Sequence, residues 1–202
     1  MLKDLLLSSP LIYKLSQVVL GKDKDLMNLA GEIGAGAKVF DIGCGPASLL
    51  KRLPESVEYH GFDPSPSYVK EARAAYKNRK AFFYCAGVDD FVLGADIKGS
   101  CDVAIASGVL HHLDDSQAKK LLNLAYNSLK EGGKLLTLDV CFIPRQNPIA
   151  RFLAKSDRGK YVRYQDEYAK ILKEVFLRNT SVTVYSDGGH LPYNHIVMKA
   201  QR

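Results

Sequence analysis

The stretch that decides the fold is residues 39–47, which read VFDIGCGPA. It begins with apolar, strand-forming residues, as a buried strand requires, and two glycines follow Asp41 closely. Gly43 and Gly45 carry no Cβ, so the chain can turn sharply there and approach a ligand closely. We expect a helix to begin at Ala47, with its free amide hydrogens facing the same crevice. The stretch therefore predicts a strand, a ligand-binding turn and a helix.

A second strand ends on another carboxylate. Residues 57–62 read VEYHGF, a run typical of a strand, and Asp63 closes it. An acidic side chain at this place in a βαβ unit accepts hydrogen bonds from the hydroxyls of a ribose. The glycine turn and Asp63 together predict a crevice that binds a nucleoside.

The nucleoside expected in this crevice is a cationic one. A dinucleotide-binding turn needs a third glycine, and this chain has Ser48 at that place. Asp41 stands just before Gly43, where its charge would repel a pyrophosphate and attract a positive group. The turn therefore favours a nucleoside cofactor that carries positive charge and no phosphate.

Residues 41–46, DIGCGP, resemble the first motif of the class I S-adenosyl-L-methionine-dependent methyltransferases, whose cofactor carries a sulfonium and an ammonium. The match continues through residues 39–139, about half of the chain. The resemblance implies S-adenosyl-L-methionine as the cofactor and a Rossmann-like methyltransferase fold. Four further segments resemble the later motifs of the family in the expected order, namely residues 61–65, 82–91, 101–113 and 129–136.

The resemblance gives each motif a part of the cofactor to bind. Asp63 and Pro64 would hold the ribose, and the segment after the third strand would contact the adenine. The family more often has an Asp directly after the glycine, whereas Val88 stands there, so Asp89 is favoured over Asp90 for this contact. With the methionine end included, the implied cofactor-binding residues are Asp41, Gly43, Cys44, Gly45, Asp63, Pro64, Val88, Asp89, Ser107 and Tyr13.

Two apolar helical stretches, residues 2–7 and 11–20, precede the first strand. In the resembled family such leading helices pack over the cofactor, so residues 1–30 are expected to form a helical cap over the cofactor cleft. Tyr13 and Gln17 share one helix face, and either would reach the methionine end of the cofactor. A core position among the neighbouring leucines stays an alternative for Tyr13.

Helices are expected to alternate with the strands after this point. Ser65 and Pro66 are a typical helix start, and so are residues 114–116. The first of these helices should end near Tyr76 and the second at the glycines 132–133. A third helix is expected over residues 165–177.

Alternation of this kind predicts an α/β fold with a doubly wound, mostly parallel sheet, which binds ligands at the carboxyl ends of its strands. The family resemblance makes it a seven-stranded sheet. Residues 181–185 and 195–200 are then the two strands of an antiparallel closing hairpin. We expect a single methyltransferase domain over residues 1–202.

The composition limits the class of protein. No run of about 18 apolar residues occurs, and the chain start lacks the pattern of a cleaved signal, so we expect a cytoplasmic protein without a membrane span. The four cysteines lack the paired spacings that metal sites require, so no metal is expected. The oligomeric state is left open.

The net charge is +6, and residues 145–178 hold nine basic residues against four acidic ones. Such an excess attracts an anionic substrate, although a solvated helix face is the ordinary alternative. No nucleic-acid-binding motif accompanies the excess. We therefore expect a small-molecule substrate, polar or anionic, and no nucleic acid.

Methyl transfer from a sulfonium requires alignment of the reacting atoms, with a base only where the acceptor loses a proton. The candidate catalytic residues are His111, His195 and Tyr193. Of the neighbours His111 and His112, one is expected to anchor the turn and the other to face the cleft, and His111 is favoured for the cleft. His60 lies inside the second strand and is expected to be structural.

Two other functions remain open. Tyr126 and Lys130 have the spacing found in NAD-dependent reductases of the short-chain class, but Tyr76 and Lys80 repeat it, so the spacing discriminates little. A non-catalytic regulator that binds S-adenosyl-L-methionine is the third reading.

Overall fold

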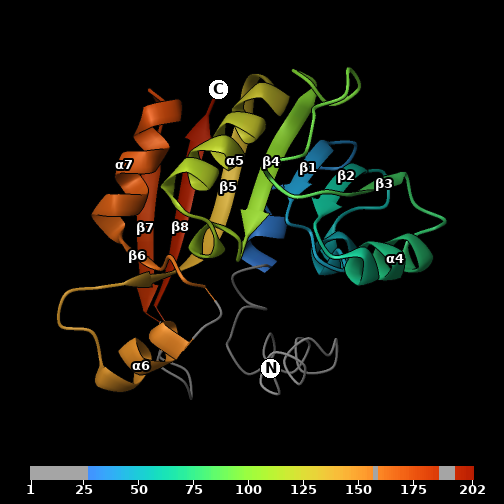
Figure 1. Cartoon of the computed structure of the whole chain (residues 1–202). Coiled ribbons are helices and arrows are strands. Elements are labelled where there is room, and N and C mark those ends of the chain that lie inside the picture. The colour runs from blue at the N-terminus through green and yellow to red at the C-terminus, as the bar shows by residue number, and fades with distance from the viewer. Residues whose placement is uncertain (1–26, 157–158, 187–193) are drawn as a thin grey trace.

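A sheet runs through the molecule, and helices cover both of its faces (Figure 1). The computed structural model describes residues 27–156, 159–186 and 194–202. The strands follow the order β3-β2-β1-β4-β5-β8-β7, and β6 pairs with β5 beside this path. Their bounds are β1 Lys38–Ile42, β2 Glu58–Asp63, β3 Ala81–Cys85, β4 Cys101–Ser107, β5 Leu129–Phe142, β6 Arg163–Tyr164, β7 Ser181–Ser186 and β8 Asn194–Gln201.

The strand pairing confirms the predicted doubly wound fold. Strands β1 to β5 run parallel, and β8 lies antiparallel between β5 and β7 as the closing hairpin. The carboxyl ends of β2, β1, β4 and β5 therefore meet in this order along one edge of the sheet. The seven strands of this path are the predicted sheet, and the two-residue β6, which pairs with β5 beside the path, is an additional strand.

Different helices cover the two faces of the sheet. Helices α5 (Asp115–Ser128) and α7 (Gln165–Val175) pack on one face, and α4 (Pro66–Ala75) packs on the other. Helix α6 (Pro148–Ser156) lies beyond the carboxyl ends of the parallel strands (Figure 1). None of the helices in the described part of the chain has the length and apolar character that a bilayer crossing requires.

The predicted helix starts are confirmed. Ser65 accepts a hydrogen bond from the N–H of Tyr68, and Pro66 opens α4. Asp114 accepts one from the N–H of Gln117 at 2.9 Å and so caps α5. The apolar stripe of α5 is buried against the sheet at Ala118, Leu121, Leu122 and Ala125.

The helix expected directly after the glycine turn is a short 3-10 helix, η1 (Ser48–Arg52). Ala47, expected to begin it, instead has a left-handed backbone with φ 57°. Leu53 returns to an extended conformation, and Pro54 follows. The predicted helix is therefore present, but it begins one residue later and is short, because the turn and the proline leave room for little more than one turn of helix.

The helix before β5 is also shorter than its sequence suggested. Helix α5 ends at Ser128, since Leu129 has an extended backbone and pairs with Cys101 of β4. A Cβ on Gly133 would lie 2.9 Å from the carbonyl oxygens of both Cys101 and Lys130. The glycine thus permits the close backbone approach at the start of β5 and does not end the helix.

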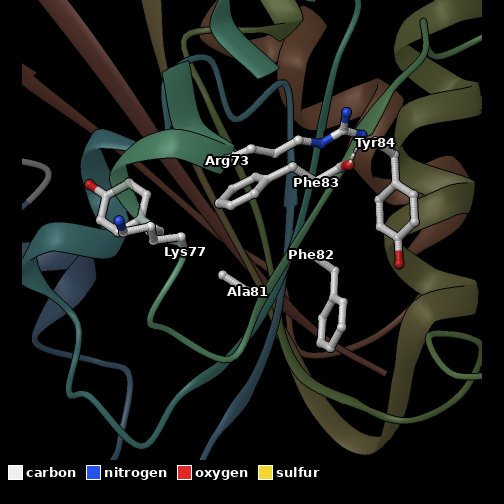
Figure 2. A pocket seen from close by; sticks show the side chains of 7 residues that line it. Arg73, Lys77, Ala81, Phe82, Phe83 and Tyr84 are labelled. Carbon is white, nitrogen blue, oxygen red and sulfur yellow. Dashed lines mark hydrogen bonds between the residues drawn. The ribbon is translucent and has the colours of Figure 1, made fainter. Parts of the chain in front are cut away.

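The edge strand β3 is protected on its open side. Arg73 of α4 donates a hydrogen bond to the carbonyl oxygen of Phe83 at 2.6 Å, as Figure 2 shows. A side chain that covers an edge strand and occupies one of its carbonyl oxygens discourages pairing with another chain. The cavity drawn in Figure 2, about 290 Å³, lies between α4 and β3 and is lined by none of the residues expected to bind the cofactor.

Replacing Gly133 by alanine is expected to lower the free energy of unfolding by about 1–3 kcal/mol, because the new Cβ meets two backbone oxygens. Urea denaturation measures the change. Gly34→Ala is the matched control, since no atom lies within 4 Å of the Cβ that it would add. Equal stability of the two variants would contradict this account of the β5 start.

Candidate functional site

The glycine turn is built as its sequence predicts. Gly43 has φ 71° and Gly45 has φ 54°, conformations that side chains with a Cβ rarely adopt. The N–H groups of Gly43 and Cys44 both donate to the carbonyl oxygen of Phe62, at 2.9 and 3.0 Å. A Cβ on Gly43 would lie 2.5 Å from the side chain of Val109. The turn is therefore packed between the end of β2 and the loop that follows β4.

Asp63 fastens this turn to the second strand. Its Oδ2 accepts the N–H of Gly45 at 2.9 Å, and its Oδ1 accepts the N–H of Ser65 at 2.8 Å. Burial raises the pKa of this carboxyl, and the two backbone N–H groups oppose that shift. Each carboxylate oxygen keeps further acceptor capacity beyond the one bond shown. The group is thus held rigidly and is still able to accept hydroxyl donors.

Asp41 lies deeper, with 4% of its surface exposed. Burial raises its pKa to about 7, the Tyr59 hydroxyl that donates to Oδ2 at 2.5 Å opposes this, and the charge of Asp63 adds to it. The carboxyl is therefore close to its ionisation midpoint at neutral pH. A cation placed beside it would stabilise the carboxylate form.

Cys44 fills the space between these groups. Its Sγ lies 2.9 Å from the position of a Cβ on Gly61, so the thiol packs directly on the β2 backbone. Burial raises the pKa of the thiol well above its usual value, and the charges of Asp41 and Asp63 raise it further. A thiol that stays protonated is a poor nucleophile, which agrees with a packing role.

The loop after β3 carries the residues expected near an adenine. Val88 packs on the apolar core under α5, while Asp89 is exposed. The Asp89 carboxylate accepts hydrogen bonds from Gln117 at 2.8 Å and Lys120 at 2.5 Å, and these bonds lower its pKa. The Asp89 side chain therefore lies on the surface of α5, where these two hydrogen bonds hold it. Ser107 ends β4 and is half-buried.

His111 is buried and fixed, in contrast to the expectation that it faces the cleft. It is 1% exposed, and its Nδ1 lies 2.6 Å from Oδ1 of Asp139. The backbone N–H of His111 donates to the same oxygen at 3.2 Å. His112 is exposed, with its ring centroid 4.1 Å from that of His111. The buried carboxylate thus makes His111 the anchor of the turn and leaves His112 on the exposed side.

The other candidates fall in different places. His195 lies in β8 opposite Val140 and is 1% exposed. His60 is buried in β2 and its Nε2 lies 3.0 Å from Glu58, in agreement with a structural role. Tyr13, Tyr193 and the expected cap up to residue 26 lie outside the described residues.

The structure thus brings the glycine turn, Asp41, Asp63 and the residues that follow β4 to one edge of the sheet. Asp139 was missed in the sequence, although a signal exists, because it is the one charged residue within the apolar run of residues 135–142. A carboxylate in a buried strand requires a partner, and here the partner is His111. Among the described residues, no group of three or more His, Cys, Asp or Glu side chains is placed to hold a metal ion.

Comparison with known proteins gives the following relationships. A family profile described as a methyltransferase domain matches residues 40–135. The carboxy-S-adenosyl-L-methionine synthase of Campylobacter fetus subsp. fetus (strain 82-40) is 29% identical over 111 residues, which is 52% of this chain and 45% of that protein. The chain thus spans about half the length of the curated relative that it matches.

Two solved structures share the fold. Phosphoethanolamine N-methyltransferase 2 of Haemonchus contortus, in complex with phosphomonomethylethanolamine and S-adenosylhomocysteine, has a TM-score of 0.70 at 14% identity over 90% of this chain and 52% of its own. The N-methyltransferase NodS of Bradyrhizobium japonicum WM9, in complex with S-adenosylhomocysteine, has a TM-score of 0.68 at 15% identity over 96% of this chain and 89% of its own. The profile match over residues 40–135, the ordered motifs and the sheet order agree with one another, and they show a methyltransferase domain with the Rossmann-like fold of the class I S-adenosylmethionine-dependent methyltransferases.

Proposed function

We propose that this protein transfers a methyl group from S-adenosyl-L-methionine to a small polar or anionic molecule. The observation that carries the proposal is the Asp63 carboxylate, which is held by the N–H of Gly45 at the edge of the sheet where Asp41 also lies. Asp63 offers an acceptor for ribose hydroxyls beside the glycine turn, whose backbone carries few side chains. Asp41 is a buried acid that favours a cationic ligand nearby.

The cofactor is assigned to the crevice residue by residue. The backbone of Gly43, Cys44 and Gly45 faces the methionine end together with Asp41, and Ser107 and Tyr13 are proposed as further contacts there. Asp63 and Pro64 take the ribose. Val88 packs against the adenine. Asp89 contacts the adenine only if its carboxylate shares or loses its hydrogen bonds to Gln117 and Lys120.

The chemistry that the cofactor supplies is an activated methyl group on a sulfonium. The protein's own task is to hold the acceptor in line with that methyl group and to exclude misaligned approaches. For a hydroxyl acceptor, we propose that the exposed His112 takes the proton, while His111 holds the turn through Asp139. His195 and Tyr193 are kept as candidates for contacts to the acceptor.

The acceptor class follows from charge. Residues 145–178 carry the basic excess; within this range α6 lies beyond the carboxyl ends of the parallel strands (Figure 1), and β6 pairs with the end of β5. A basic surface at the entrance attracts anions and raises their local concentration. The structure from Haemonchus contortus holds a phosphorylated amine, which supports an anionic acceptor here by analogy alone.

The reductase alternative loses its support in the structure. Tyr126 packs edge-on against Phe176 with a ring distance of 5.3 Å, and Lys130 forms an ion pair with Asp102. Both residues of the supposed pair are therefore occupied in packing and surface pairing. A non-catalytic regulator would bind S-adenosyl-L-methionine as an enzyme does, but it would not transfer the methyl group.

Native mass spectrometry of the purified chain tests the cofactor first. We expect binding of S-adenosylhomocysteine and none of NAD, and binding of NAD alone would overturn the proposal. Incubation with methyl-labelled cofactor and metabolite extract then separates the enzyme from a regulator. Mass analysis of the products also reveals any reaction on the cofactor itself, the chemistry that the name of the Campylobacter relative describes.

Replacing Asp63 by alanine should weaken S-adenosylhomocysteine binding by about 1.5–3 kcal/mol, as expected for lost hydrogen bonds to a charged group. Isothermal titration calorimetry measures the change. Glu131→Ala removes one exposed negative charge elsewhere and serves as the control. An unchanged affinity in folded Asp63→Ala would remove this residue from the site.

The affinity for S-adenosyl-L-methionine should rise with pH up to about 7 and then level off. Burial raises the pKa of Asp41 to about 7, and a bound cation lowers it again, so binding releases a proton below that pH. We expect a gain of up to about tenfold between pH 5.5 and pH 7. The free energy of unfolding of the free protein should fall as the pH rises from about 4 to about 7. The reason is that the folded state holds the proton on Asp41 more tightly than the unfolded state does.

Asp41→Asn provides the control for this pH dependence. Its amide does not titrate, so the rise in affinity and the proton release, measured by calorimetry in two buffers, should both disappear. The same pH dependence in wild type and Asp41→Asn would exclude Asp41 as its source.

Replacing His112 by alanine is expected to slow transfer to a hydroxyl acceptor by about 10²-fold with little change in melting temperature, because a proton acceptor is lost. His111→Ala should instead lower the melting temperature, since it removes the imidazole partner of the buried Asp139 and leaves only the backbone N–H of residue 111 as a donor. Thermal melts and labelled-methyl transfer measure both effects. A folded His111→Ala that loses activity beside a fully active His112→Ala would reverse the two roles.

A further inference from the structure

Residues 159–164 lie against the turn that carries the two histidines. We call residues 159–164 the strap and residues 110–113 the histidine turn. The N–H of Tyr161 donates to the carbonyl oxygen of His111 at 2.9 Å. A Cβ on Gly159 would come within 2.1 Å of Cδ2 of the His111 ring and 2.6 Å of its carbonyl oxygen. The strap is thus in direct contact with the His111 side chain and backbone.

Arg163 fastens the strap in place. Its Nη1 donates to the carbonyl oxygens of Leu110 and Tyr161, each at 3.0 Å. Its Nη2 donates to the carbonyl oxygen of Leu113 at 2.7 Å and to Asp115 at 2.8 Å, and its Nε donates to Asp115 at 3.0 Å. These bonds match the five N–H donors of a guanidinium, so the group is fully used.

The far end of the strap is tied to the sheet. Arg163 and Tyr164 form β6 and pair with Cys141 and Phe142 at the end of β5. Asp139, which holds His111, precedes this pairing on the same strand. The histidine turn is therefore held by hydrogen bonds on two sides. The strap donates to its carbonyl oxygens, and Asp139 contacts the imidazole of His111.

The ion pair with Asp115 is a poor explanation for this arrangement. The Arg163 side chain is 7% exposed, whereas that of Asp115 is 80% exposed, so the ion pair is well solvated on one side and adds little. An apolar side chain at the Arg163 position would leave the carbonyl oxygens of Leu110, Tyr161 and Leu113 without this donor. What the guanidinium adds is a fixed, planar set of donors that sets the positions of the carbonyl oxygens of Leu110 and Leu113.

We infer that Arg163 is a positioning residue for methyl transfer, because it locks the strap onto the histidine turn and thereby sets the positions of the buried His111 and of the exposed His112 beside it. The inference rests on the proposed function for its catalytic consequence. Its structural part, the control of the histidine side chains by Arg163, is independent of the reaction.

The test compares Arg163→Lys with Arg73→Lys as the matched control. Both wild-type arginines donate to backbone carbonyl oxygens, but Arg73 does so to Phe83 at the β3 edge. Lysine keeps the charge and loses the planar fork. Histidine-selective nitrogen NMR over a pH series reports the environment of His111 and His112, and calorimetry with S-adenosylhomocysteine reports the cofactor site.

We expect Arg163→Lys to shift the resonances and the titration midpoint of His111 or His112, and Arg73→Lys to leave them unchanged. Cofactor affinity should stay within about twofold, and kcat for the extract fraction that wild type methylates should fall about 10²-fold, as expected for misplaced reacting groups. Should Arg163→Lys not fold, Gly159→Ala displaces the His111 ring without touching the guanidinium and should shift the same resonances.

Unchanged histidine resonances together with an unchanged pH profile of kcat in Arg163→Lys would overturn the inference. So would an equal loss of activity in Arg73→Lys, which would indicate a general loss of stability. Absence of cofactor binding in wild type would refute the proposed function instead, and the NMR comparison would still decide whether Arg163 positions the histidine turn.

Discussion

The bond from the Gly45 N–H to the Asp63 carboxylate is the constraint on which the candidate site depends. It ties the turn after β1 to the end of β2, and the second oxygen of Asp63 ties the start of α4 to the same point. Both glycines of the turn have positive φ, so the conformation that Asp63 stabilises is one that other residues rarely adopt. Without this anchor, the crevice loses the backbone surface and the carboxylate that together suit a nucleoside.

The two sides of the candidate site differ in charge. The cofactor side contains Asp41 and Asp63, buried acids that each raise their own proton affinity by desolvation and so favour a cationic ligand. The proposed acceptor side is bordered by the basic region that includes α6 and the strap. A cofactor that brings positive charge to the acidic side leaves the basic side to an anionic or polar acceptor. On the proposed function, these charges would orient the two substrates as well as attract them.

The sequence was sufficient for the fold class because strand and helix patterns alternate with clear caps at Ser65 and Asp114. It failed where tertiary contacts override local pattern. Gly132 and Gly133 look like a helix stop, yet Gly133 serves the close approach of β5 to the backbone of Cys101. His111 and His112 are neighbours with the same local pattern, and only the distant Asp139 separates their roles. The role of Arg163 has no local signal at all, because its partners lie about fifty positions earlier in the chain.

The central claim is that the crevice over Gly43, Gly45 and Asp63 holds the adenosyl cofactor. A crystal structure of the chain grown with S-adenosylhomocysteine tests this most directly. We predict that the ribose hydroxyls donate to Asp63 and that the homocysteine end lies over the glycine turn beside Asp41. Density for the nucleoside in another cavity, such as the one between α4 and β3 in Figure 2, would contradict the account.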